Sequence, residues 1–266
     1  MTQTDIDTSG FPTGYFVVCS IGSNRLLDVT MDDIEDGTEI ALWPEKEKSL
    51  VESFRDPDTN NQVFFIDTAG ALCSRSAGHA IDVEGDRLVL RHRRPVSFPF
   101  PNSYAHPLPK FSYSAKTGEI SVHFACDPAY PGPETAPSTA WQGKTYLLTS
   151  VPKRKPRTII DDASAFIASN ILTPISFLTG TQAPAQAQPD EVFGADIDLN
   201  EDELVEEERS EEAEIDNDPE LARKVRIVTA PTAEKDMLDL LLSEKARNRR
   251  RWVISPLRTT NAKTPS

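Results

Sequence analysis

The chain lacks the features that mark several protein classes. It has only three cysteines, Cys19, Cys73 and Cys126, without CxxC spacing, so we expect neither a disulfide framework nor a metal site. It contains no run of 18 apolar residues, so we expect no membrane span. Residues 1–10 have neither a basic nor an apolar stretch and contain Asp5 and Asp7, so we expect no classical secretory signal peptide. These absences favour a cytoplasmic protein.

Positive charge is also scarce, and it is unevenly distributed. Lys and Arg number 28 against 42 Asp and Glu, a net charge of −14 that argues against nucleic acid as a partner. Residues 190–220 hold 16 acidic side chains and one basic one, whereas residues 221–266 hold 11 basic and 4 acidic ones. Such an acidic block cannot form a compact core, because its charges repel and it has few apolar side chains. We therefore predict a disordered acidic linker over 181–220 and a basic, partly helical tail over 221–266.

No catalytic motif is present. The four histidines, His79, His92, His106 and His123, lie in different segments. The sequence contains no nucleophile elbow, zincin motif, phosphate loop or dinucleotide fingerprint. We therefore predict that the protein is not an enzyme and needs no cofactor.

Residues 11–152 alternate short apolar segments with turn sequences, a pattern typical of an all-β sandwich or barrel. Ten strands are predicted, over residues 14–21, 25–30, 39–44, 62–67, 71–76, 79–84, 87–93, 110–115, 119–125 and 144–151. Two Leu/Ile-Asp-Val cores, RLLDVT and HAIDVE, follow aromatic strands, and each is followed by a turn and an apolar strand. A four-strand unit of about 45 residues, present three times, predicts a β-trefoil over residues 11–152.

The first unit carries a resemblance to a known family. The segment GYFVVCSIGSNRLLDVTMDDIEDGTEIALWPEKEK, followed by NNQVFFID, resembles the first repeat of a ricin B-type β-trefoil lectin domain, and in particular fungal members of that class. The resemblance is partial in the second unit and weak in the third, and it does not extend beyond residue 152. It implies carbohydrate binding without catalysis, and a glycan or glycoprotein as the partner.

The resemblance also implies a sugar site in the first repeat. The aspartate that accepts hydrogen bonds from sugar hydroxyls corresponds to Asp28, and the aromatic residue that stacks on the ring corresponds to Trp43. The amide pair corresponds to Asn61 and Gln62, and Lys46 corresponds to a basic residue on the rim. A sugar has a polar edge and an apolar face, so a carboxylate beside an aromatic ring suits it.

Other interpretations of these residues remain open. The aspartate of a Leu-Asp-Val strand can bond the following turn, the glutamine can support the barrel, and Trp43 can cap the interior. A weaker second site would use Asp82 and His92, with His92 in the aromatic position and no amide pair. The third repeat has no comparable set.

Two alternatives to carbohydrate binding follow from other segments. The trefoil could have lost sugar binding and serve as an intracellular scaffold, with a protein partner held by the C-terminal tail. It could also inhibit proteases through the loop at residues 99–109.

Two further elements are predicted in the C-terminal part. Residues 158–180 have apolar side chains at helical spacing and predict an amphipathic helix that Pro174 interrupts. A second helix is predicted over 232–252, ending in an arginine-rich sequence. The basic clusters at 152–157 and 246–252 are candidate nuclear import signals, which predict a partly nuclear distribution.

Overall fold

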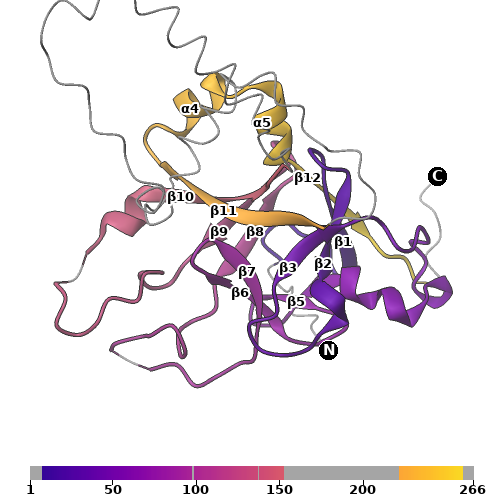
Figure 1. Ribbon diagram of the computed structural model, residues 1–266, viewed down its shortest axis with the longest axis horizontal. Helices are drawn as coiled ribbons and strands as arrows, with labels where there is room; N and C mark the ends of the chain where they lie inside the picture. Colours follow the sequence, from indigo (N-terminus) through magenta and orange to yellow (C-terminus); the bar gives the residue numbers. More distant parts are fainter. Residues whose placement is uncertain (1–7, 98, 137, 153–221, 260–266) are drawn as a thin grey trace, which may run out of the picture.

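The computed structural model describes residues 8–97, 99–136, 138–152 and 222–259 (Figure 1). The amphipathic helix predicted over 158–180 and the acidic linker predicted over 181–220 lie outside these residues. Twelve strands occur in the described part of the chain. They are β1 (Tyr15–Ser20), β2 (Arg25–Val29), β3 (Ile40–Trp43), β4 (Phe64–Ile66), β5 (Leu72–Ser74), β6 (Ala80–Glu84), β7 (Arg87–Arg91), β8 (Lys110–Ser114), β9 (Glu119–His123), β10 (Lys144–Ser150), β11 (Arg223–Pro231) and β12 (Trp252–Pro256).

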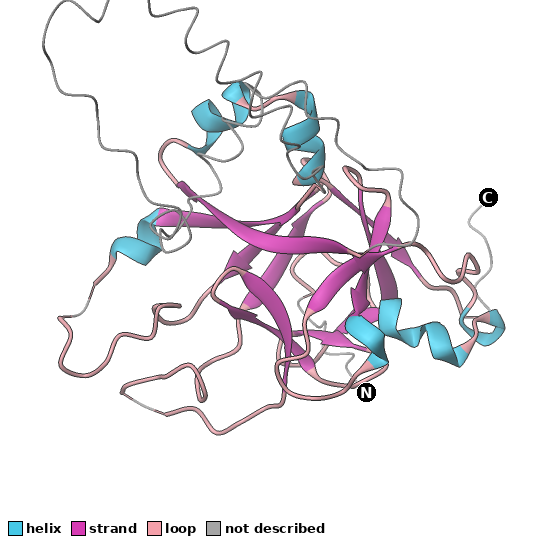
Figure 2. Cartoon of the chain, in the orientation of Figure 1, coloured by secondary structure: helices cyan, strands magenta, loops and turns pink. Residues whose placement is uncertain are grey.

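The ten strands predicted from the sequence are all present as β1 to β10. Each is a short segment with apolar residues bounded by turn sequences, so local pattern was sufficient to find them. The short helices α4 (Lys235–Leu241) and α5 (Glu244–Arg249) lie outside the strands at one end of the molecule (Figure 2). Four 3-10 turns complete the structure: η1 (Thr30–Asp32), η2 (Glu52–Phe54), η3 (Pro57–Gln62) and η4 (Ala140–Gly143).

Strand pairing shows that the fold is a β-trefoil. Three antiparallel hairpins, β2–β3, β6–β7 and β10–β11, recur once in each group of four consecutive strands. The remaining strands join the hairpins, and β1 pairs with β2, with β4 and with the last strand, β12. The first and last strands are therefore neighbours, as they are in a sheet that closes on itself.

The predicted C-terminal boundary of the trefoil is wrong. Residues 221–266 were expected to form a tail, yet β11 and β12 belong to the same twelve-stranded sheet as β1 to β10. β11 pairs with β10 over seven residues, from Lys144 opposite Pro231 to Ser150 opposite Val225 (Figure 1). The long acidic segment is thus an insertion in the third hairpin. Because this segment separates β11 and β12 from the rest of the third repeat in the sequence, these two strands were not predicted.

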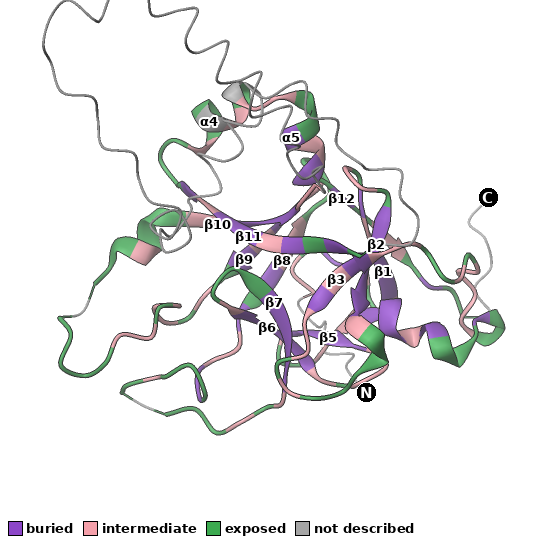
Figure 3. Ribbon diagram, viewed as in Figure 1, coloured by how far each residue is buried: buried purple, intermediate pink, exposed green. Residues whose placement is uncertain are grey.

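The hydrophobic core confirms that the third repeat is completed after the insertion. The closing strands β4, β8 and β12 each carry a fully buried aromatic residue near their start, respectively Phe64, Phe111 and Trp252. All three belong to one cluster, and buried residues follow the strands into the centre of the molecule (Figure 3). The indole Nε1 of Trp252 donates a hydrogen bond to the Leu148 carbonyl at 3.0 Å.

Arg226 connects the three hairpins where they meet. It lies on β11, and its guanidinium is within 2.9 Å of Glu39 in the first hairpin and 3.2 Å of Asp86 in the second. In addition, β11 pairs with both β3 and β7. The segment after the insertion therefore organises the end of the barrel that carries all three hairpin loops.

The single helix predicted over 232–252 is two short helices. Ser243 accepts a hydrogen bond from the Ala246 backbone N–H, which makes it the N-cap of α5 and separates α5 from α4. In the basic cluster at 246–252, Arg249 and Arg250 are buried, at 7% and 4% exposure. Two of the four arginines in that cluster are therefore largely shielded from solvent, although the sequence analysis treated the cluster as a candidate nuclear import signal. The other basic cluster lies largely outside the described residues.

Candidate functional site

The outer face of the first hairpin carries the main candidate site. In the β2–β3 register, Leu27 lies opposite Leu42 and Asp28 lies opposite Ala41. Successive side chains point to opposite faces, so the two leucines enter the core while Asp28 and Trp43 share the outer face. Asp28 and Trp43 are diagonal neighbours across the two strands, at a backbone separation of roughly 7–8 Å. The hairpin thus presents a carboxylate beside an aromatic ring.

Three of the other side chains expected at this site contact Asp28 directly. Asn61 Nδ2 donates to Oδ1 at 3.0 Å, and Gln62 Nε2 donates to Oδ2 at 2.9 Å. The Lys46 ammonium lies 2.8 Å from Oδ2. Asn61 and Gln62, which are more than 30 positions from Asp28 in the sequence, therefore converge with Lys46 on one carboxylate.

Gln62 is the rigid support of this cluster. Its Nε2 also donates to the Pro44 carbonyl at 3.0 Å, and its Oε1 accepts from the Lys46 backbone N–H at 3.0 Å. The amide is fully buried, and its bonds fix the strand end that follows Trp43. Gln62 therefore does both things that the sequence analysis considered. It supports the barrel, and it orients the Asp28 carboxylate.

Asn61 differs from Gln62 in one respect. Its Nδ2 bonds Asp28 and the Val29 carbonyl, but its Oδ1 is buried without a hydrogen-bond partner among the described residues. A buried acceptor without a partner is costly, on the order of 1–3 kcal/mol. Such an atom is better tolerated where a ligand or water can reach it.

The Asp28 carboxylate retains some capacity for a ligand. A carboxylate has about four lone-pair positions, and three are occupied here. Lys46 is the partner that can leave most easily, because its side chain is 32% exposed while that of Asp28 is 4% exposed. Burial raises the pKa of Asp28 above its ordinary value, and the hydrogen bonds and charge of Lys46 and Gln62 partly offset this effect.

The second repeat has a different arrangement, and the position assigned to His92 is wrong. Ile81 pairs with Leu90 as Leu27 pairs with Leu42, so Arg91 occupies the position of Trp43. His92 is one residue further on. A shift of one residue moves a side chain to the opposite face of a strand, which explains why His92 does not lie beside the aspartate.

Internal partners occupy the Asp82 carboxylate. Arg91 Nε and His106 Nε2 each lie 2.9 Å from Oδ2, and the Val83 backbone N–H donates to Oδ1 at 2.8 Å. Asp82 is completely buried. Burial alone would raise the pKa of Asp82, but the bonds from His106 and Arg91 outweigh it and hold the pKa below its ordinary value. Asp82 therefore acts as the counter-ion of a buried arginine.

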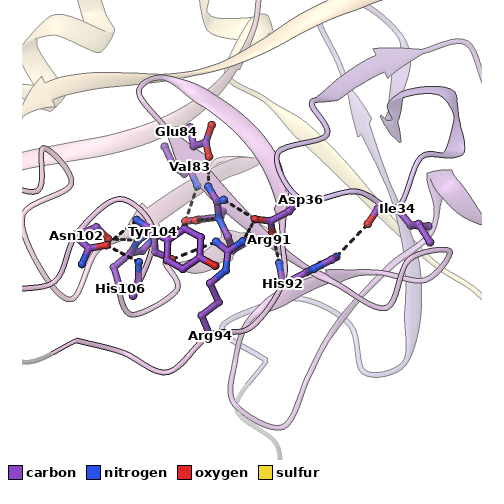
Figure 4. A network of polar contacts seen from close by, with 12 residues as sticks. Ile34, Asp36, Val83, Glu84, Arg91, His92, Arg94, Asn102, Tyr104 and His106 are labelled. Carbon is purple, nitrogen blue, oxygen red and sulfur yellow. Dashed lines mark hydrogen bonds and ion pairs between the residues drawn. The ribbon is translucent and has the colours of Figure 1, made fainter.

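His92 joins the first hairpin loop to the second repeat (Figure 4). Its backbone N–H donates to Asp36 Oδ1 at 2.6 Å, and its ring Nε2 lies 3.3 Å from the Ile34 carbonyl. Asp36 also accepts from Arg91 Nη1 at 3.1 Å and from Arg94. The hydrogen bonds of His92 are thus with the loop between β2 and β3, its ring packs against that of His79, and it does not contact Asp82.

His106 gives the second repeat a predicted pH dependence. Its two ring nitrogens face oxygen acceptors, Nδ1 the Asn102 carbonyl and Nε2 Asp82, each at 2.9 Å. Only the imidazolium can donate from both nitrogens. Burial disfavours this charge, but the bond and the charge of Asp82 outweigh burial and raise the pKa of His106. Because the folded-state pKa is raised, this stabilisation is fully present below about pH 6.5, the ordinary value.

We therefore expect the free energy of unfolding to fall as the pH rises through the raised pKa of His106. Urea unfolding at about pH 6 and about pH 9 measures the change. His106→Gln removes the titrating group and should flatten that difference. An equal difference in the wild type and the variant would assign the pH dependence to other groups.

The third repeat has neither a carboxylate nor an aromatic residue at these positions. Leu148 pairs with Ile227 in the core, so Thr149 and Val228 take the places of Asp28 and Trp43. Thr149 donates to the adjacent Ser150 carbonyl at 3.4 Å. Of the three described hairpins, the first alone combines a carboxylate with an aromatic ring.

Sequence reasoning missed Arg91, His106 and Asp36. Arg91 could have been placed correctly by aligning the two hairpins on their core leucines. His106 and Asp36 carry no such signal, because each reaches its partner from a loop of irregular structure.

Among the described residues, no group of three or more His, Cys, Asp or Glu side chains is arranged to hold a metal ion. No helix in the described ranges is long and apolar enough to cross a membrane.

Comparisons with known proteins gave structural matches only. No protein-family model matches the sequence, and no curated protein matches it. The solution structure of the mdaA-1 domain has a TM-score of 0.43 at 14% identity, covering 96% of this chain and 97% of that chain. The C-half of the earthworm R-type lectin in complex with GalNAc has a TM-score of 0.31 at 18% identity, with 53% and 78% covered.

A third match is the Macrolepiota procera ricin B-like lectin in complex with lactose, with a TM-score of 0.27 at 13% identity and 51% and 73% covered. All three TM-scores are below 0.5, and all three identities are below 20%. The assignment of the β-trefoil fold rests on the strand pairing of this chain.

Proposed function

We propose that this β-trefoil is a non-enzymatic carbohydrate-binding protein with its sugar site on the first hairpin. The observation that carries the proposal is the Asp28 carboxylate, which lies beside Trp43 on one outer face and is oriented by the amides of Asn61 and Gln62. The second and third repeats are not part of the proposed site.

The roles follow from the chemistry of a sugar ring. Asp28 accepts hydrogen bonds from two adjacent hydroxyls, with Lys46 moving off Oδ2 to admit one of them. Asn61 holds the Asp28 carboxylate in place through the hydrogen bond from its Nδ2. Trp43 stacks on the C–H face of the ring, as aromatic side chains do with flat apolar surfaces. One shallow site of this kind binds with about 4–6 kcal/mol, or millimolar to high-micromolar dissociation constants.

Asp28→Asn tests this site. The asparagine fills the same volume but lacks the charge and one acceptor, so glycan affinity should fall at least tenfold, or about 1.4 kcal/mol. A glycan array followed by titration calorimetry with the sugars that bind measures the loss. Asp33→Asn is the matched control, because Asp33 is an exposed carboxylate in the adjacent loop. A wild-type protein that is folded and yet binds no glycan would contradict the proposal.

A further inference from the structure

The outer face that carries Trp43 continues across three more strands. Leu26 lies opposite Trp43, Cys19 lies opposite Leu26, and Val253 on β12 lies opposite Cys19. These four side chains form one cross-strand row on the same face of the sheet. Strands are spaced at about 4.8 Å, so the row is roughly 14 Å long. It begins at the aromatic residue of the proposed sugar site.

A groove of about 630 Å³ lies over the part of this row that follows Trp43. Leu26, Cys19 and Val253 all line it, and Pro44, which directly follows Trp43, forms part of its wall. Val253 is 47% exposed, so the far end of the groove is open to solvent. The polar residues along the groove carry hydroxyl, amide and charged groups of both signs: Ser23, Asn24, Arg25, Glu45, Lys48 and Ser255.

We infer that this groove extends the sugar site and holds further units of an oligosaccharide whose first unit lies between Asp28 and Trp43. The inference rests on the proposed function. An apolar floor with hydroxyl and amide groups at its edges repeats the chemistry of the first unit, since each ring of a glycan has a C–H face and a polar edge. The groove also begins next to the first site, because Pro44 and Glu45, which lie between Trp43 and Lys46 in the sequence, form part of its wall.

The strand pairing disfavours a peptide as the occupant. An extended peptide binds a sheet by adding a strand to an open edge. The floor strands β1 and β2 are flanked on both sides, β1 by β12 and β2, and β2 by β1 and β3. The backbone groups of β1 and β2 are used by neighbouring strands, so side chains must provide recognition over these two strands.

The test compares glycans of increasing length on the full chain. The probes are galactose, lactose and 6′-sialyllactose, together with an array of mono- to tetrasaccharides of other sugars. In the wild type, we expect affinity to increase about tenfold from a monosaccharide to the tri- or tetrasaccharide that contains it.

Val253→Arg places a long side chain over the open end of the groove and should abolish this gain while monosaccharide affinity is unchanged. Met237→Arg is the matched control, because Met237 is an exposed apolar residue on α4, outside the groove. If Val253→Arg does not fold, Lys48→Ala provides the same comparison at an exposed position and should reduce the gain.

The possible outcomes separate the two hypotheses. Asp28→Asn should weaken binding of every glycan, whatever its length. Equal affinity for monosaccharides and longer glycans in the wild type would overturn the extended site and leave the first site intact. A gain with length that persists in the folded groove variants would also overturn it. A folded wild type that binds no glycan would overturn both proposals.

Discussion

A fragment of residues 1–152 will show no cooperative unfolding transition, although it contains all the strands that local sequence pattern predicts. It lacks β11 and β12, and with them Val225, Ile227 and Trp252 of the main hydrophobic cluster. Burying each such side chain contributes about 1.5–3 kcal/mol, so the loss is roughly 5–9 kcal/mol. Typical net stability is about 5–15 kcal/mol, so little or none would remain. In the fragment, β1 and β10 would each also lose one of their neighbouring strands.

The complementary variant should fold. Residues 153–222 would be removed and Pro152 joined through Asn-Gly to Arg223, which lies opposite it if the β10–β11 register continues, so that Asn-Gly forms a two-residue hairpin turn. The ends are close enough, because the Val151 N–H bonds the Lys224 carbonyl at 2.9 Å. Circular dichroism and urea unfolding compare the two variants with the whole chain. A cooperative transition in the fragment, or its absence in the shortened chain, would show that the hairpin β10–β11 does not close the barrel.

Asp82→Ala will destabilise the protein by about 3 kcal/mol or more, the range for removing one partner of a buried ion pair. The Arg91 side chain is 8% exposed, so its charge would lose a close partner in a poorly hydrated place. Arg91 retains Asp36 and Glu84 as partners, which places the effect at the lower end of that range. His106 would lose the acceptor at Nε2 as well. Thermal or urea unfolding measures the loss.

Two controls give this prediction its specificity. Asp86→Ala removes an ion pair whose carboxylate is 51% exposed and should cost less than about 1 kcal/mol. The double variant Asp82→Ala/Arg91→Ala should be less destabilised than the sum of the single variants, because it removes both charges. Glycan binding by folded Asp82→Ala should match the wild type. A small effect on stability combined with a loss of binding would make Asp82 a ligand-binding residue instead.

The arrangement of Asp28 and Trp43 on the first hairpin could be predicted because it follows from the residue pattern of two adjacent strands. Asp28 and Trp43 share a face through the period-2 alternation of two adjacent strands joined by one turn, and that alternation can be read directly from the residues. Asn61 and Gln62 were found through the family resemblance, and the structure places their amides on the Asp28 carboxylate.

The second hairpin was misread because register is a property of pairing. His92 and Arg91 are adjacent, and nothing in the sequence RHRR states which of them lies opposite Ala80. The pairing of Ile81 with Leu90 decides it, because burial of these two side chains fixes the faces of both strands. The Arg91 guanidinium then lies against Asp82 and fills a position that an aromatic ring occupies in the first hairpin.

The sequence by itself indicated the all-β class, the β-trefoil and ten of the twelve strands in the described residues, and through the family resemblance it led to the residues of the proposed first site. Each depends on alternation, turn residues or a motif within some 40 positions. Only the tertiary structure decided that β11 and β12 complete the third repeat, that His106 hydrogen-bonds Asp82, and that a groove runs from Pro44 to Val253. These depend on contacts between residues brought together from distant segments, such as Cys19 opposite Val253, and such contacts form only when the sheet closes.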